Sequence, residues 1–173
     1  MRLTSVLATV FVAVVLQAAF SRYTVGGTIT FDLVLVGVAY AALQWGAAAG
    51  MVAGTLGGLI QDLLGGGIIG VGGLAKTLVG YLAGTVGAQF VLARPHVRTA
   101  IVAVASLLHR IVVLLLVAVI DQRWSGLPWV AMLIETGINA GAAFIAFQVT
   151  DALPGVVERG RASRRSGFSR RQW

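Results

Sequence analysis

The sequence predicts an all-α integral membrane protein, a bundle of six transmembrane helices. Hydrophobic residues make up 58% of its 173 residues, and charged residues only 11%. Soluble domains carry roughly 25% charged residues, so this chain has too few charges to cover a water-exposed surface. The bilayer must therefore act as the solvent for most of its exterior. A chain of this length forms a single membrane domain, which we expect over residues 1–153.

Six apolar runs divide the chain and are the predicted spans. The first has 18 residues, and its length of roughly 27 Å matches the thickness of the hydrocarbon core. It begins like a signal peptide after Arg2, but it is long for one and ends at a poor cleavage site, so we predict a retained helix. The second run is short. The predicted spans are residues 3–20, 31–45, 46–64, 74–93, 99–120 and 128–150.

Beyond Pro154 the chain is basic, and we predict that residues 154–173 form a disordered cytoplasmic tail. Arginines beside a membrane domain attract anionic lipid head groups. Nucleic-acid binding is not expected, because no aromatic platform accompanies the charge. The arginines of the tail are Arg159, Arg161, Arg164, Arg165, Arg170 and Arg171.

The distribution of arginine predicts the orientation in a bacterial cytoplasmic (inner) membrane. With the N-terminus inside, the inner segments carry the six tail arginines together with Arg2, Arg94 and Arg98, whereas the outer turns carry only Arg22 and Arg123. Positively charged residues favour the cytoplasmic side. Both termini are therefore predicted in the cytoplasm, which agrees with an even number of spans.

Glycines recur at every fourth residue of the third span and continue on the fourth. This spacing places them on one helix face, where another backbone can approach closely. Packing within the chain is one interpretation, and docking of a partner helix is the other. Because the third span has more small residues than one neighbour needs, we predict that part of this stripe packs against a partner helix. The stripe comprises Gly46, Gly50, Gly54, Gly58, Gly80 and Gly84.

Asp62 and Lys76 lie near the outer ends of the third and fourth spans, on either side of a loop with six glycines at 65–73. Charged side chains at membrane depth are costly and usually paired or functional. We therefore predict an Asp62–Lys76 ion pair. It either holds the glycine loop closed or contributes to a site at the outer rim.

Arg110 lies near the centre of the fifth span, and Glu135 and Asn139 share a face of the sixth. The fifth and sixth spans are predicted to be antiparallel neighbours. Counted from their shared turn, Arg110 and Glu135 differ in depth by roughly 5 Å, which an arginine side chain can bridge. We predict an Arg110–Glu135 pair that acts as a structural clamp rather than as a proton relay. His109 is predicted to be a hydrogen-bonded core histidine.

No arrangement of residues supports an enzyme, a metal site or a cofactor. The chain has no cysteine and only two histidines, neither with carboxylates placed to complete a metal site. The glycine-rich loop lacks the spacing of a phosphate-binding loop.

The region from Asp32 to Gly84 resembles a known family. It contains FDLVL at 31–35, a glycine-rich helix ending in GLIQDLLG at 58–65, and GYLAG at 80–84. These features, with the chain length and the six predicted spans, resemble the rod shape-determining protein MreD family. The resemblance implies a non-enzymatic component of the cell-wall elongation machinery that binds the single-pass protein MreC. It further implies association with RodA, its partner transpeptidase and MreB. The sequence leaves open whether the chain forms a homodimer.

The resemblance also implies a fold similar to the substrate-binding subunits of energy-coupling-factor transporters. A small-molecule-binding subunit of a vitamin-type transporter is therefore the alternative function. Such a subunit needs an outward cavity lined by polar or aromatic groups. The sequence offers few of these, namely Asp32, Tyr40, Asp62, Lys76 and Tyr81.

Overall fold

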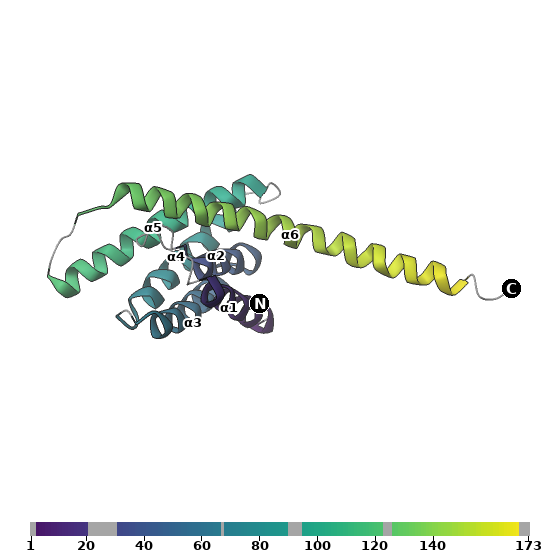
Figure 1. Ribbon diagram of the computed structural model, residues 1–173, viewed down its shortest axis with the longest axis horizontal. Coiled ribbons are helices and arrows are strands. Elements are labelled where there is room, and N and C mark those ends of the chain that lie inside the picture. The colour runs from purple at the N-terminus through teal and green to yellow at the C-terminus, as the bar shows by residue number, and fades with distance from the viewer. Residues whose placement is uncertain (1–2, 21–30, 67, 90–94, 123–125, 170–173) are drawn as a thin grey trace.

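The computed structural model describes the backbone of residues 3–20, 31–66, 68–89, 95–122 and 126–169, and side chains as far as residue 152. The described part of the chain contains six helices, which confirms the all-α prediction. These are α1 (Leu3–Phe20), α2 (Leu33–Trp45), α3 (Ala47–Gly65), α4 (Val71–Gln89), α5 (Pro95–Asp121) and α6 (Trp129–Ser169). Figure 1 shows them as one bundle, from which the C-terminal part of α6 projects.

The short helix α2 is the centre of the bundle, because it contacts each of the other five helices. Eight of its 13 residues are buried. Its apolar surface extends all round, as expected of a helix inside a protein core. One side packs with α1 and α3 around Val10 and Val38, and another packs with α5 and α6 around Ala39, Val102 and Phe147.

A single glycine joins α2 to α3. Gly46 has a φ angle of +89°, a backbone conformation that side chains with a Cβ rarely adopt. Its N–H still donates to the Ala42 carbonyl at 2.9 Å, so the last turn of α2 stays closed while the chain changes direction. This sharp reversal sets α3 against α2 without a loop.

Four of the six helices are long and apolar enough to cross a membrane: α1, α3, α5 and residues 129–152 of α6. Helix α2, with 13 residues, is shorter, and α4 carries a buried lysine among its glycines. These two helices are also the ones most enclosed by the rest of the chain, so packing rather than lipid contact determines their composition.

Two helix boundaries differ from the prediction in an informative way. Helix α4 begins at Val71 rather than at residue 74, because a carboxylate from α3 binds the N–H groups at its start. Helix α6 was expected to end near Thr150, before the basic tail, but its backbone remains helical to Ser169. Pro154 lies inside it, although proline removes one hydrogen bond from a helix.

Candidate functional site

The glycine stripe of α3 lies against α4 of the same chain, and this pair forms the most extensive helix contact in the molecule. A Cβ atom added to Gly50 would collide with the Gly80 carbonyl, and one added to Gly54 would collide with the Lys76 carbonyl. A Cβ on Gly58 would lie 2.7 Å from the Gly72 carbonyl oxygen. The two backbones therefore touch along the whole stripe, which only glycine permits.

This geometry corrects the prediction of a partner helix on the stripe. Five of its glycines, Gly50, Gly54, Gly58, Gly80 and Gly84, are buried. Gly84 faces Ala47 at the other end of the same contact. A partner helix cannot occupy the surface that α4 already fills. The sixth member, Gly46, has open space where its Cβ would be and serves as the turn between α2 and α3.

Asp62 caps α4 from the end of α3. Its Oδ2 atom accepts hydrogen bonds from the backbone N–H groups of Gly70, Gly72 and Gly73, at 2.9, 3.0 and 3.2 Å. The first N–H groups of a helix have no partner inside it, and a carboxylate there is also favoured by the helix dipole. Asp62 therefore holds the glycine loop closed through the backbone.

We expect Asp62→Ala to lower the free energy of unfolding by about 2 kcal/mol, the upper range for loss of a helix cap. Three backbone N–H groups lose their acceptor in this variant. Thermal unfolding in detergent measures the effect. Asp62→Asn, which retains one carbonyl oxygen, should lose less than half as much, and equal losses in the two variants would contradict the capping role.

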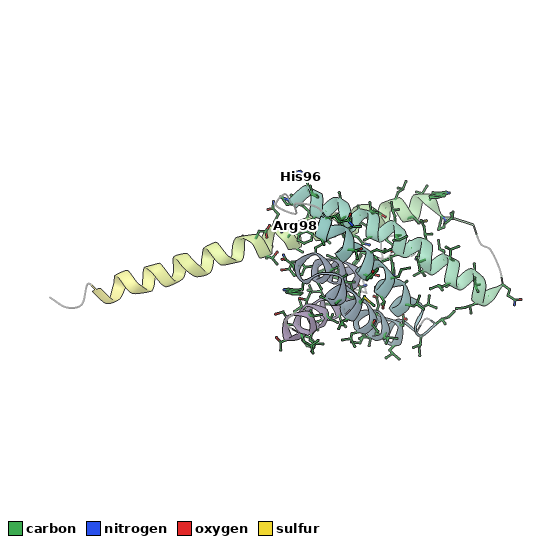
Figure 2. The ribbon with its side chains drawn as sticks, turned by 180° about the vertical axis from the view of Figure 1, so that it is seen from behind. His96 and Arg98 are labelled. Carbon is green, nitrogen blue, oxygen red and sulfur yellow. The ribbon has the colours of Figure 1, made fainter. Side chains whose placement is uncertain are left out.

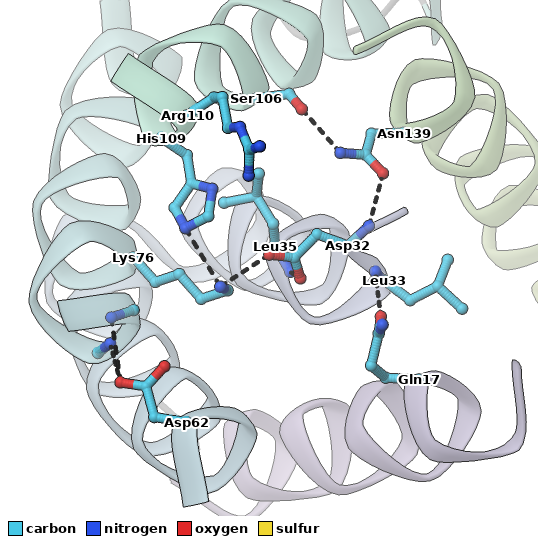
Figure 3. Close-up of polar contacts among 12 residues, drawn as sticks. Gln17, Asp32, Leu33, Leu35, Asp62, Lys76, Ser106, His109, Arg110 and Asn139 are labelled. Carbon is cyan, nitrogen blue, oxygen red and sulfur yellow. Dashed lines mark hydrogen bonds and ion pairs between the residues drawn. The ribbon is translucent and has the colours of Figure 1, made fainter. Parts of the chain in front are cut away.

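The lysine of α4 pairs with the aspartate at the start of α2. Lys76 Nζ lies 2.7 Å from Asp32 Oδ2 and 3.2 Å from His109 Nε2 (Figure 3). Asp32 and Lys76 are 5% and 2% exposed, so the pair is shielded from solvent by the bundle. Since an ammonium group only donates, His109 accepts at Nε2 and is uncharged. Asp32 also caps α2, accepting from the Leu35 N–H at 2.9 Å.

The predicted Asp62–Lys76 ion pair is therefore wrong. Lys76 is more than one turn inside α4 and points to the start of α2, whereas Asp62 Oδ2 accepts from the N–H groups at the start of α4. Asp32, which was considered only as a cavity residue, is the true partner. A carboxylate preceding an apolar run is a helix-cap signal, but it does not reveal which cation the same carboxylate meets.

The side chains of one asparagine and one glutamine form hydrogen bonds with backbone groups at the start of α2. The fully buried Asn139 accepts from the Asp32 N–H at 2.9 Å and donates to Ser106 Oγ at 2.7 Å. Gln17 of α1 donates to the Phe31 carbonyl at 3.0 Å and accepts from the Leu33 N–H at 2.7 Å. Asn139 was predicted to belong with Arg110 and Glu135, and no contact was predicted for Gln17.

The Arg110–Glu135 pair predicted from helix depth is present, with Arg110 Nε 3.8 Å from Glu135 Oε2. The prediction of His109 as a hydrogen-bonded core residue is also confirmed, because it is 7% exposed and bonded to Lys76. At 3.8 Å the Arg110–Glu135 contact is electrostatic and longer than a hydrogen bond. The cluster contains Asp32, Lys76, Arg110 and Glu135, two charges of each sign.

A second ion pair joins α5 and α6 at the other end of their contact. Arg98 Nη1 lies 3.1 Å from both carboxylate oxygens of Asp151, and its guanidinium stacks over the Phe147 ring, 5.6 Å from the centroid. Figure 2 places Arg98 near the beginning of α5, close to His96. The side chains of Arg98 and Asp151 are 18% and 48% exposed, so solvent weakens this ion pair.

Some predicted residues lie outside the described side chains. These are Arg159, Arg161, Arg164, Arg165, Arg170 and Arg171 of the tail. In the part of the chain that is described, no group of three His, Cys, Asp or Glu side chains is placed to hold a metal ion.

Comparison with known proteins agrees with this architecture. The family model described as rod shape-determining protein MreD matches residues 1–146, well over half of the chain. No curated protein and no solved structure matches it, so the expected likeness to energy-coupling-factor transporter subunits finds no support. The protein is thus a multi-pass membrane protein with at least four candidate spans. It belongs to the MreD family of rod shape-determining proteins, which are non-enzymatic.

Proposed function

We propose that this protein is a membrane scaffold of the bacterial cell-wall elongation machinery. In this role it binds the single-pass protein MreC and supports RodA and its partner transpeptidase, which follow the MreB filament. Family membership supports the proposal. The structural observation that carries it is the buried cluster at the start of α2, where Lys76, Asp32 and Asn139 are bonded to groups of the same chain. Such bonds commit these three side chains to holding the helices of the same chain together, as expected of a scaffold.

The proposal places all six helices in the cytoplasmic membrane with both termini in the cytoplasm. The arginine distribution supports this orientation. Helix α6 has 41 residues and a length of about 60 Å, roughly twice the hydrocarbon thickness. It therefore carries the basic C-terminal segment well beyond the bundle, where it meets anionic lipids and cytoplasmic partners. A homodimer is compatible with this placement.

Co-purification tests the proposal. When the protein is expressed with MreC and extracted in mild detergent, we expect the two to purify together in fixed stoichiometry. In rod-shaped cells depleted of their own MreD, expression of this chain should restore the rod shape. Purification without MreC, but with a bound small molecule and an ATPase module, would establish the transporter alternative instead.

A further inference from the structure

The turn between α3 and α4, residues 63–70, exposes large aliphatic side chains. Leu63, Leu64, Ile68 and Ile69 are 64%, 68%, 45% and 64% exposed. Every residue from 63 to 75 is apolar or glycine, so this apolar turn and the start of α4 carry no polar side chain. Turns that face water are usually rich in polar residues. The composition of the apolar turn is therefore unlike that of a loop on an aqueous surface.

Backbone N–H groups where the apolar turn enters α4 are all satisfied within the chain. Three of the N–H groups of residues 70–74 donate to Asp62 Oδ2. Those of Val71 and Leu74 donate to carbonyl groups of the same turn, at 3.2 and 2.8 Å. In water, solvent can accept from such groups, whereas in hydrocarbon each of them needs an acceptor from the protein. This segment therefore meets the condition for contact with lipid.

The apolar turn lies on the membrane side of the polar end of α5. Helices α3 and α4 have 19 residues each and α5 has 27. These lengths are about 28 Å and about 40 Å, against a hydrocarbon thickness of roughly 30 Å. Figure 1 shows the end of α5 reaching past the turn between α3 and α4. Because α5 ends at the exposed residues Asp121 and Gln122, which favour water, the water boundary lies beyond the apolar turn.

The chemistry of the apolar turn favours lipid over a protein as its neighbour. Protein interfaces carry about one hydrogen bond per 100–200 Å² of buried area. The apolar turn offers no side-chain donor or acceptor, and the N–H groups of residues 70–74 are already bonded. Acyl chains require only apolar surface, and aliphatic side chains that enter the boundary between head groups and acyl chains bind a bilayer through the area they bury.

We propose that the apolar turn is a membrane-inserted element, whose four exposed aliphatic side chains bind acyl chains of the outer leaflet. Asp62 permits this insertion, because it is the acceptor for backbone groups that water would otherwise satisfy. The inference uses the orientation proposed above to name the leaflet, and it does not depend on binding of MreC.

Cysteine labelling tests whether the apolar turn faces lipid or water. The chain has no cysteine, so Ile69→Cys and Asp121→Cys each provide a single thiol. Both residues are exposed on the protein, so a difference between them reports what surrounds it. In membranes opened to both sides, a charged maleimide should label Ile69→Cys at least about tenfold more slowly than Asp121→Cys, because the reactive thiolate does not form in hydrocarbon. Equal rates in the membrane would overturn the proposal, and equal rates after denaturation are the control.

Spin labels at the same two positions separate lipid from a protein partner. A nitroxide in hydrocarbon collides with oxygen, one in water collides with a hydrophilic nickel chelate, and one covered by protein collides with neither. We expect oxygen to dominate at Ile69→Cys and the chelate to dominate at Asp121→Cys, with and without MreC. Low accessibility to both reagents at Ile69→Cys when MreC is present would show that a protein covers the apolar turn, and would overturn the proposal.

The proposed orientation and the proposed function are tested separately. In sealed vesicles, labelling of Asp121→Cys from the cytoplasmic side alone would contradict the orientation, but the comparison with Ile69→Cys would still decide whether the apolar turn is inserted. Failure to purify with MreC would overturn the scaffold and leave the result at the apolar turn unchanged.

Discussion

Replacing Lys76 by methionine is expected to lower the free energy of unfolding by about 3–5 kcal/mol. The substitution preserves an unbranched apolar stem but leaves the Asp32 carboxylate buried without its cation. An unpaired carboxylate in a low-dielectric interior is among the most destabilising changes that one substitution produces. Thermal or denaturant unfolding in detergent, followed by circular dichroism, measures the loss.

A double variant separates the effect of an unpaired charge on stability from the effect of changing the side-chain shape. Lys76→Met with Asp32→Asn removes both charges, and asparagine can still cap α2 through its side-chain oxygen. We expect it to regain more than half of the lost stability, since a neutral pair is often as stable as a buried ion pair. Arg98→Met, at the partly exposed pair with Asp151, should cost only about 1 kcal/mol. A mild effect of Lys76→Met alone would contradict the buried pair.

Replacing Gly54 by leucine should lower the free energy of unfolding by about 3 kcal/mol or more. Its Cβ would collide with backbone atoms of Lys76 and Thr77, which cannot move as a flexible side chain does. Helices α3 and α4 must then separate along their whole contact, and the Asp32–Lys76 pair is disturbed with them. We expect a low yield of monodisperse protein and a lower unfolding temperature.

The matched control is Gly137→Leu on α6. Gly137 is also a helical glycine, but nothing lies within 4 Å of its added Cβ. This variant should remain within about 0.5 kcal/mol of the parent, as surface substitutions usually do. Gly54→Ala isolates the Cβ itself and should already destabilise the protein. If Gly54→Leu were as stable as Gly137→Leu, close backbone contact would not hold α3 to α4.

Pairings between neighbours in the chain were partly predictable. Arg110 and Glu135 lie on consecutive antiparallel helices, so counting residues from their shared turn placed them at compatible depths. The pair predicted in the same way between Asp62 and Lys76 is wrong, although these residues flank a shorter loop. Depth counting predicts that two side chains can meet, but not that a backbone N–H group or a distant carboxylate competes for one of them.

The glycine stripe is a second case in which the sequence predicts a contact surface but not the partner that packs on it. Its four-residue spacing predicted one face suited to close helix approach, and the structure confirms that face. Which helix covers it depends on the turn at Gly46 and on the loop that Asp62 holds closed, because these place α4 rather than another chain against α3. The four-residue spacing predicts that a helix packs on this face, but only the path of the chain shows that the helix is α4.

By itself, the sequence determined the membrane class, the six helices and the absence of catalytic motifs, because hydropathy and residue spacing are local properties. The tertiary structure decided that α2 is the buried centre, that Lys76 meets Asp32, and that the Nε atom of Arg110 is buried without an acceptor. These outcomes depend on which side chains from distant segments arrive at the same depth and face. A buried charge is stabilised by whichever partner the packed helices bring to it.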